Sequence, residues 1–170
     1  MCLVCGRDNP LGLHARFYEL APEEPAAAGA SAGPAPAAGP ELLGVFQVLE
    51  EHQSYPGRLH GGISSTILDE TIGRAILLIQ PGAWGVTVEF TVRFRKPVPL
   101  DEEVRCVARI TRDTSRIFEG TGEILLADGS VAVQGSGKYL KQTLEGITDH
   151  DFVEREWFTD LREAPDEVEL

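Results

Sequence analysis

The sequence has little positive charge for its size. Its 170 residues carry 15 Lys and Arg against 27 Asp and Glu, which leaves a formal net charge of -12 at pH 7. A protein that binds nucleic acid neutralises phosphates with a basic face. The composition therefore argues against a nucleic-acid partner, and the length suits one domain with some additions.

A secretory leader, a disulfide framework and a long apolar run are also missing. The first five residues hold no basic region followed by an apolar one, as a signal peptide would. Three cysteines without a framework suit a reducing compartment. The most apolar stretch is interrupted by polar residues, which argues against a membrane span. We therefore expect a cytoplasmic protein with no membrane partner.

Ligands for a metal ion are scarce. Cys2 and Cys5 form a CxxC pair, but a closed zinc site usually needs four ligands, and the third cysteine, Cys106, lies deep in a strand pattern. A dimer could pool two such pairs, with His14 nearby. The alternative is that the two cysteines are small apolar side chains at the entrance of a strand. We expect no metal and no resident cofactor.

What the chain does have is one apolar stretch at 59–79 (LHGGISSTILDETIGRAILLI). Placed on a helical wheel at 100° per residue, its apolar side chains spread over most of the circumference. A helix that is apolar on most sides is buried. The pattern therefore predicts a central helix that is wrapped by a sheet.

Two acids interrupt this apolar surface. Glu70 has Arg74 four residues later, in the favourable orientation for an i,i+4 ion pair. Asp69 has no such partner, because Ser65 and Gly73 occupy the equivalent positions. A carboxylate on a buried helix is costly unless something satisfies it, so Asp69 is either a functional residue or an acceptor that holds a loop in place.

The start of the helix adds a second chemical element. The first amides of a helix are unsatisfied and lie at the positive end of its dipole. Gly61 and Gly62 carry no side chains, so a ligand can approach this backbone closely. The pair is a candidate oxyanion hole, although a tight turn into the helix explains it equally well on its own.

The remaining periodicity predicts strands on both sides of the helix. The clearest is 86–95, where Val and Phe alternate with polar residues and indicate one buried face. In the last strand, Gly135 and Gly137 mark a place where something passes close to the backbone. The predicted strands cover residues 13–20, 42–50, 86–95, 103–112, 117–126 and 130–140.

The fold class is therefore α+β, with one curved antiparallel sheet around one long helix. The predicted order is strand, strand, helix, then four strands in a meander. We expect one domain over residues 1–140, interrupted at 21–40 by an Ala, Pro and Gly-rich insert without fixed structure. Residues 141–170 form a helical tail. Because a single sheet leaves its edge and outer face uncovered, we expect a homodimer or a homotetramer built as a dimer of dimers.

With these residues in view, the chain resembles the hotdog-fold acyl-CoA thioesterases, in particular the group of the phenylacetate-pathway and 4-hydroxybenzoyl-CoA enzymes. The most specific part is His60-Gly61-Gly62 with an acid nine residues after the histidine, which is Asp69. The segments 85–90 (GVTVEF) and 93–97 (RFRKP), and the opening CxxCG with NPLGL at 9–13, are also similar. The resemblance covers residues 2–140 without the insert.

The resemblance implies roles for these residues. Asp69 is the catalytic carboxylate, which either attacks the thioester carbonyl or activates water. The Gly61 amide polarises the carbonyl, His60 orients the loop, and Thr87 positions water or the carboxylate. In the family these groups meet across a dimer interface, so that Gly61 of one chain serves Asp69 of the other.

The substrate itself, an acyl-CoA, is expected to contact a wider set. Arg93, Arg95 and Lys96 form a local basic cluster that suits a CoA phosphate, unless it is only the solvated face of a strand. The other candidates for contact with the substrate are Gly62, Ser54, Val88 and Glu70.

Two departures from the family pattern stand out. Related enzymes often carry Asn or Gln six residues before the histidine, where this chain has Ser54. Gln53 is a possible substitute, but it is one position out of register. In addition, Glu70 follows Asp69 directly, so the assignment to Asp69 rests on spacing and on the pairing of Glu70 with Arg74.

The leading hypothesis is a thioesterase for small, aromatic or medium-chain acyl-CoA. The alternative is an acyl-CoA or acyl-carrier binding protein without catalysis, which the replacement at Ser54 motivates. A hydratase on the same fold is a third hypothesis, but it pairs a catalytic histidine with an acid in a different place. The acyl group, CoA or carrier as donor, nucleophile or general base at Asp69, and dimer or tetramer all remain open.

Overall fold

A computed structural model describes residues 2–6, 8–20, 39–100 and 102–147. The predicted insert at 21–40 lies outside the described residues except for its last two, and so does the predicted tail helix around 149–161. The described part of the tail contains one short helix, α2 (Leu144–Ile147). The fold below therefore concerns the sheet, the central helix and the loops between them.

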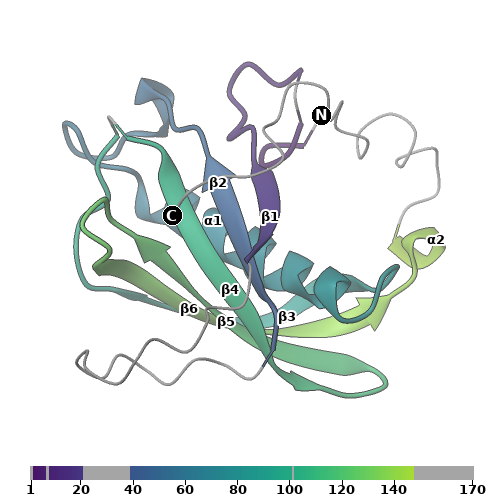
Figure 1. Cartoon of the computed structure of the whole chain (residues 1–170). Helices are drawn as coiled ribbons and strands as arrows, with labels where there is room; N and C mark the ends of the chain where they lie inside the picture. The colour runs from purple at the N-terminus through teal and green to yellow at the C-terminus, as the bar shows by residue number, and fades with distance from the viewer. Residues whose placement is uncertain (1, 7, 21–38, 101, 148–170) are drawn as a thin grey trace, which may run out of the picture.

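The molecule is a six-stranded antiparallel sheet curled around one helix, α1 (Gly61–Arg74) (Figure 1). This confirms the predicted hotdog architecture. The strands follow the order β1-β2-β4-β5-β6-β3 across the sheet. Their bounds are β1 Arg16–Leu20, β2 Glu41–Phe46, β3 Trp84–Phe94, β4 Val104–Asp113, β5 Ile117–Leu125 and β6 Val131–Gln142.

The predicted four-strand meander is wrong in one respect. Strands β4, β5 and β6 do follow one another as hairpins, but β3 pairs with β6, from Trp84 opposite Gln142 to Phe94 opposite Val133. The helix carries the chain across the inner face of the sheet, so the strand after it joins the opposite edge. Strand β4 then pairs with β2, which joins β1 and β2 to the rest of the sheet.

The helix is buried where the sequence places its apolar residues. Ile67, Leu68 and Ile72 are fully buried, and each such side chain contributes about 1.5–3 kcal/mol by leaving water. A Cβ at Gly135 would lie 3.3 Å from Cβ of Leu68, which explains the predicted close passage at this glycine. The helix is shorter than the predicted 59–79, because a 3₁₀ turn over Ala75–Leu78 follows it, and Ile79 is exposed.

Strand β3 differs most from its prediction. Phe90 and Val92 of the predicted buried face pack against the core and are partly buried. Val86, Val88 and Phe94, in contrast, expose 40, 57 and 55% of their surfaces. The reason is its position, because β3 is an edge strand that pairs only with β6 among the described residues. A register shift between Thr87 and Glu89 also leaves Val88 without a partner in β6, as in a β-bulge. The result is an apolar, unpaired edge.

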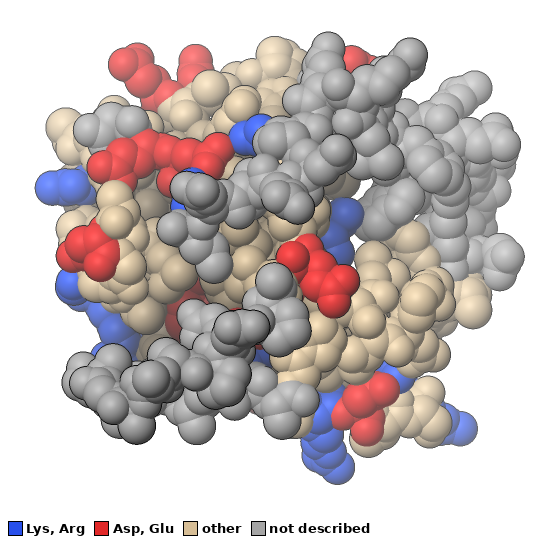
Figure 2. All heavy atoms as spheres, in the orientation of Figure 1, with Lys and Arg blue, Asp and Glu red and all other residues tan. Residues whose placement is uncertain are grey.

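Charges on the outer face of the sheet are paired across strands. The guanidinium of Arg109 on β4 lies 2.5 Å from a carboxylate oxygen of Glu41 and 2.9 Å from one of Glu123. Figure 2 shows acidic and basic side chains mixed over the face in view. Among the described residues, no helix is both long and apolar enough to cross a bilayer.

Candidate active site

The site begins at the start of α1, where His60 is the N-cap residue. Its Nδ1 accepts a hydrogen bond of 2.9 Å from the amide of Gly62, and its own amide donates to the carbonyl of His52 at 2.9 Å. His60 therefore fixes the loop and satisfies one of the free amides of the first turn. This is the orienting position that the resemblance implies for it.

The neighbouring amide of Gly61 is left open. Among the described residues it has no hydrogen-bond acceptor, and it lies at the positive end of the helix dipole. The Phe94 ring packs beside it, since a Cβ at residue 61 would lie 3.3 Å from that ring. A hollow of about 270 Å³ begins here, and it is lined by Leu59, Gly61, Ser64, Phe94, Arg95, Lys96, Pro97, Val98 and Val133.

Asp69 lies two turns further along α1, and two hydroxyl groups donate to the same oxygen of its carboxylate. The distances to Oδ1 are 2.9 Å from Oγ1 of Thr87 and 3.1 Å from the hydroxyl of Tyr139. Both of these hydrogen bonds go to Oδ1, and none to Oδ2 is found among the described residues. The carboxylate is thus held by one oxygen, while the other is available for chemistry.

Sequence reasoning missed Tyr139. Its ring is buried and stacks on Phe118 with centroids 4.9 Å apart. Burial, together with the nearby charge of Asp69, raises the pKa of the Tyr139 hydroxyl, so this group is a donor at neutral pH. A signal existed in the sequence, because a buried tyrosine hydroxyl needs a partner and Asp69 had none.

The second acid, Glu70, is engaged elsewhere. Its carboxylate lies 2.6 Å from the Arg74 guanidinium, in the predicted i,i+4 pair. The same guanidinium lies over the ring of Phe17, 4.2 Å from its centroid, a cation–π contact. The two neighbouring acids therefore differ in environment, since Glu70 faces a cation and Asp69 faces hydroxyl groups.

A largely apolar cavity of about 290 Å³ opens beside Asp69. Trp84 and Val86 of β3 and Leu77 after the helix form much of its wall. The whole lining consists of Cys2, Cys5, Asp69, Glu70, Gly73, Arg74, Leu77, Ala83, Trp84, Gly85, Val86, Thr87, Tyr139 and Ile147. A carboxylate at the edge of an apolar cavity is the arrangement expected of a small-molecule site.

The loop before the helix was predicted to bring Ser54 or Gln53 to the site, but neither residue lies at the hollow beside Gly61 or at the cavity beside Asp69. Ser54 is exposed, and its amide donates to the carbonyl of Arg58 at 2.9 Å. The side chain of Gln53 accepts a 2.7 Å hydrogen bond from the amide of Gly57, so it holds its own turn.

The basic cluster is brought only partly to the site. Arg95 and Lys96 line the hollow at Gly61. Arg95 donates a hydrogen bond to the side-chain oxygen of Gln134 at 2.8 Å. Lys96 donates one to the hydroxyl of Ser130, also at 2.8 Å. Arg93 is exposed on β3 and does not line this hollow.

Two further candidates, Gly62 and Val88, line neither hollow. The amide of Gly62 is already bonded to the imidazole of His60. Val88 lies at the bulge of β3, with 57% of its surface exposed.

Gly61 and Asp69 are too far apart to act together within one chain. Eight residues separate them on one helix, which corresponds to about 12 Å along its axis. A carbonyl that accepts a hydrogen bond from Gly61 is therefore out of reach of the carboxylate on the same chain. A single chain therefore holds the open amide of Gly61 and the carboxylate of Asp69 at two separate places.

The described residues hold no group of three or more His, Cys, Asp or Glu side chains that could bind a metal ion. Cys2 and Cys5 line the same cavity as Asp69 and Glu70.

Comparison with known proteins gives a consistent result. The sequence profile of the thioesterase superfamily matches residues 56–133. Acyl-coenzyme A thioesterase 13 from Homo sapiens is 30% identical over 91 residues, which are 53% of this chain and 65% of that protein. The mouse protein of the same name is 32% identical over 76 residues, or 45% of this chain and 54% of its own length. This chain thus spans less than two thirds of the length of these relatives.

Solved structures agree on the fold. Zebrafish thioesterase superfamily member 2 has a TM-score of 0.55 at 23% identity, over 59% of this chain and 73% of that one. A Bacillus halodurans protein solved with CoA has a TM-score of 0.54 at 23% identity, over 59% of this chain and 66% of that one.

Proposed function

We propose that this chain is a member of the thioesterase superfamily, whose profile matches residues 56–133, and that it hydrolyses the thioester of a small, aromatic or medium-chain acyl-CoA. The observation that carries the proposal is the carboxylate of Asp69, which two hydroxyl groups hold at the edge of an apolar cavity. The cavity suits an acyl group, and the free carboxylate oxygen suits a reaction at the carbonyl carbon.

In the proposed reaction, Asp69 acts in one of two ways. It removes a proton from a water that adds to the thioester carbonyl, or its oxygen adds to the carbonyl and water then cleaves the resulting anhydride. In both routes the C–S bond breaks, and CoA leaves as a thiol. Thr87 and Tyr139 fix the carboxylate, while the amide of Gly61 stabilises the negative charge that develops on the carbonyl oxygen.

This reaction requires two copies of the chain. The apolar edge of β3 supports a dimer, because an exposed edge strand of this kind is a template for pairing with another chain. Two β3 strands that pair antiparallel near Phe90 set the Thr87 end of one opposite the Phe94 end of the other. Thr87 contacts Asp69, and Phe94 packs beside Gly61. Such a two-fold interface therefore brings Gly61 of each chain towards Asp69 of the other, which gives two sites per dimer.

The CoA portion is proposed to lie along the hollow at Gly61. Arg95 and Lys96 line it, and they provide local positive charge on a chain whose net charge is -12. The guanidinium and ammonium groups suit the CoA phosphates. The Bacillus halodurans structure with CoA supports a nucleotide ligand for this fold.

The experiment that tests the function is thiol release from a panel of phenylacetyl, benzoyl, short-chain and medium-chain acyl-CoA esters. We expect turnover of at least one ester by the wild type and its loss in Asp69→Asn, with the fold retained. Turnover that persists in Asp69→Asn would remove Asp69 from the reaction. Offering the preferred acyl group on a carrier protein instead of CoA distinguishes the two donors.

A second candidate function, acyl-CoA binding without catalysis, rests on the loop at Ser54 and Gln53. The position that carries Asn or Gln in related enzymes is a serine here, and the Gln53 amide group holds its own turn. The site therefore has the amide of Gly61 as its one clear donor to the carbonyl. Acyl-CoA esters that bind but are not cleaved by the wild type would favour this function.

A further inference from the structure

The mechanism above leaves the CxxC turn at the N-terminus unused, although the turn is tightly built. Sγ of Cys2 accepts backbone hydrogen bonds from Val4 at 3.3 Å and from Cys5 at 3.5 Å. The amide of Gly6 donates to the carbonyl of Cys2 at 3.2 Å. A Cβ at residue 6 would lie 2.4 Å from that carbonyl oxygen, so the turn closes only around a glycine. Both sulfur atoms are therefore held on one short turn.

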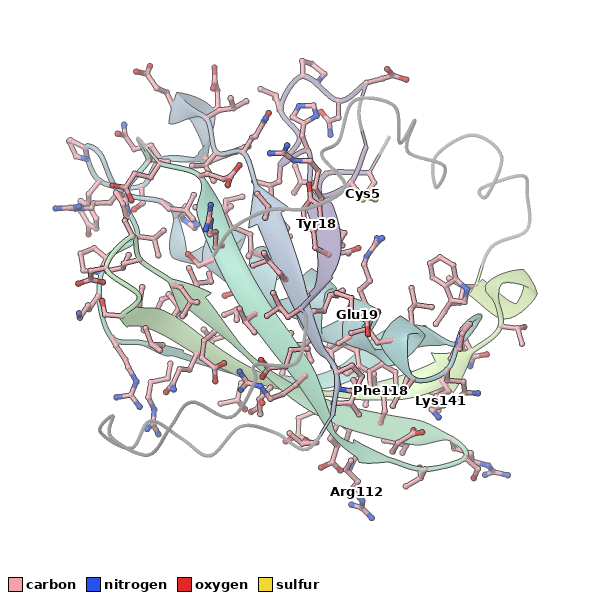
Figure 3. The ribbon with its side chains drawn as sticks, viewed as in Figure 1. Cys5, Tyr18, Glu19, Arg112, Phe118 and Lys141 are labelled. Carbon is pink, nitrogen blue, oxygen red and sulfur yellow. The ribbon has the colours of Figure 1, made fainter. Side chains whose placement is uncertain are left out.

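Hydrogen bonds attach this turn to the body of the protein. The side chain of Asn9 donates to the carbonyl of Cys2 at 3.3 Å. The amides of Leu13 and Ala15 donate to the carbonyls of Leu3 and Val4, at 2.8 and 2.9 Å. Figure 3 shows Cys5 at this turn, near the start of β1. The positions of the two thiols are thus set by the same segment that leads into the sheet.

The two thiols also interact with each other. The Cys5 thiol donates a hydrogen bond to the Cys2 sulfur, which lowers the pKa of Cys2 below its ordinary value and raises that of Cys5. Partial burial and the charge of Glu70 offset part of the lowering of the Cys2 pKa. The charge of Arg74 likewise offsets part of the rise in the Cys5 pKa. The balance is one thiolate beside one thiol, which is the reactive state of a CxxC pair.

The location of the pair separates it from an ordinary surface turn. Both cysteines line the cavity that holds Asp69, so small molecules that enter the cavity reach them. A metal is disfavoured as the occupant, because no third ligand joins the pair among the described residues. Cys106, on β4, is fully buried.

We propose that Cys2 and Cys5 form a redox-active dithiol in the wall of the cavity, which a peroxide converts to a disulfide. The thiolate of Cys2 attacks one peroxide oxygen, the O–O bond breaks, and one water leaves as Cys2 becomes a sulfenic acid. The sulfur of Cys5 then attacks the sulfur of Cys2 and displaces a second water. The two thiols lose two protons and two electrons, and the peroxide takes up all of them to become two water molecules.

The test is chemical and needs no acyl-CoA, so its outcome is independent of the proposed function. In the Cys106→Ala variant of the full chain, we expect hydrogen peroxide to remove two hydrogen atoms by intact-mass measurement. Dithiothreitol should restore both thiols to alkylation. Cys5→Ser in this background should instead accumulate a sulfenic acid at Cys2 that dimedone traps, and Cys2→Ser should not react at low peroxide.

Two results would overturn the proposal. One is that both thiols remain open to alkylation after peroxide treatment, or that Cys2 passes directly to a sulfinic acid. The other is that the protein binds one zinc ion per dimer and that zinc alone protects both cysteines, which would make the turn half of a shared metal site.

Tryptophan fluorescence gives a second readout of where the pair lies. Trp84 lines the same cavity, and a disulfide quenches nearby indole emission. In a Trp157→Phe variant that leaves Trp84 as the only indole, we expect emission to fall on oxidation and to recover with dithiothreitol. Emission that does not change while the disulfide forms would contradict the placement of the pair in the cavity wall.

Discussion

The hydroxyl of Tyr139 lies 3.1 Å from Oδ1 of Asp69, although 70 positions separate the two residues in the sequence. Thr87, from the neighbouring strand, donates to the same oxygen. One carboxylate oxygen is therefore saturated by two side chains from β3 and β6, and the other is left for chemistry. The proposed reaction needs this asymmetry, because one oxygen must be held while the other reacts.

Removing these donors tests how Asp69 is positioned. We expect Tyr139→Phe to lower kcat/KM roughly ten- to a hundredfold, because a hydrogen bond to a charged group is lost. Thr87→Ala should have a smaller effect, since Thr87 is exposed. A merely structural role for Tyr139 would lower thermal stability and leave kcat/KM unchanged at a temperature where the variant is folded.

Substitution of Asp69 should lower turnover far more than substitution of its neighbour Glu70. Asp69→Asn removes the reacting oxygen and should lower turnover roughly a thousandfold or more. Glu70→Gln loses an ion pair with Arg74 that is partly exposed, so turnover should change less than about tenfold. Thiol release from the preferred ester measures both variants under identical conditions. If Glu70→Gln were the inactive variant, the carboxylate assignment would be wrong.

The amide of Gly61 can be deleted without removing the helix. Proline is favoured at the first position of a helix and has no N–H, and His60 already has the extended backbone that precedes a proline. We expect Gly61→Pro to lose most of its turnover. Gly61→Ala adds a similar contact with Phe94 but keeps the amide, and it should retain more activity. Equal losses in both variants would mean that crowding against the ring is responsible.

Mixing two inactive variants tests whether the site is shared. Dimers that combine Asp69→Asn with Gly61→Pro contain one intact site if the amide and the carboxylate come from different chains. Random mixing should then restore roughly a quarter of wild-type turnover, since half of the dimers are mixed and each has one of two sites. A site built within a single chain recovers nothing in this experiment.

The exposed edge of β3 predicts where assembly is vulnerable. Val88→Asp places a charge in the middle of the proposed interface, so we expect monomers by analytical ultracentrifugation and a loss of turnover. Ile79→Asp is the matched control, because Ile79 is also an exposed apolar residue but lies beyond the end of the helix. A Val88→Asp protein that is dimeric and active would place the interface elsewhere.

The thiols should differ in their response to pH. Because the pKa of Cys2 is lowered to about 5, its thiolate persists as the pH falls, and its alkylation by iodoacetamide should slow only as the pH approaches that value. Burial raises the pKa of Cys106 to about 12, so this residue stays protonated and should not react in the native protein. In Cys5→Ala, where the donor to the Cys2 sulfur is removed, the alkylation midpoint of Cys2 should rise.

Local pattern was sufficient to predict the helix and the Glu70–Arg74 pair, which leaves Asp69 without a cation on its own helix. The apolar period sets which side of α1 is buried, and the i,i+4 rule gives Glu70 its partner. The position of β3 was not predictable in this way, because its alternation of Val and Phe resembles that of a half-buried strand. Which edge it joins depends on where the helix releases the chain, and that is a property of the whole sheet.

Tyr139 shows a second limit of reading a sequence locally. Its contact with Asp69 joins β6 to the helix, and no spacing rule connects positions so far apart. Ser54 and Gln53 illustrate the converse. Their sequence position suggested a second donor to the carbonyl, but the local turn, closed by the bond from Gly57 to the Gln53 side chain, directs them elsewhere.

The bulge at Val88 adds one residue to β3 and so shifts the alternation of its side chains between the two faces of the sheet. Side chains alternate between the faces of a strand. If all of these residues were in a regular strand without a bulge, Thr87 would face away from Phe90 and Phe94. The extra residue resets this parity and sets Thr87 opposite Tyr139, in phase with Phe90 opposite Gly137. A β3 strand that kept Val88 in the regular alternation would therefore turn the hydroxyl of Thr87 away from Asp69 while every residue of the site is still present in the chain.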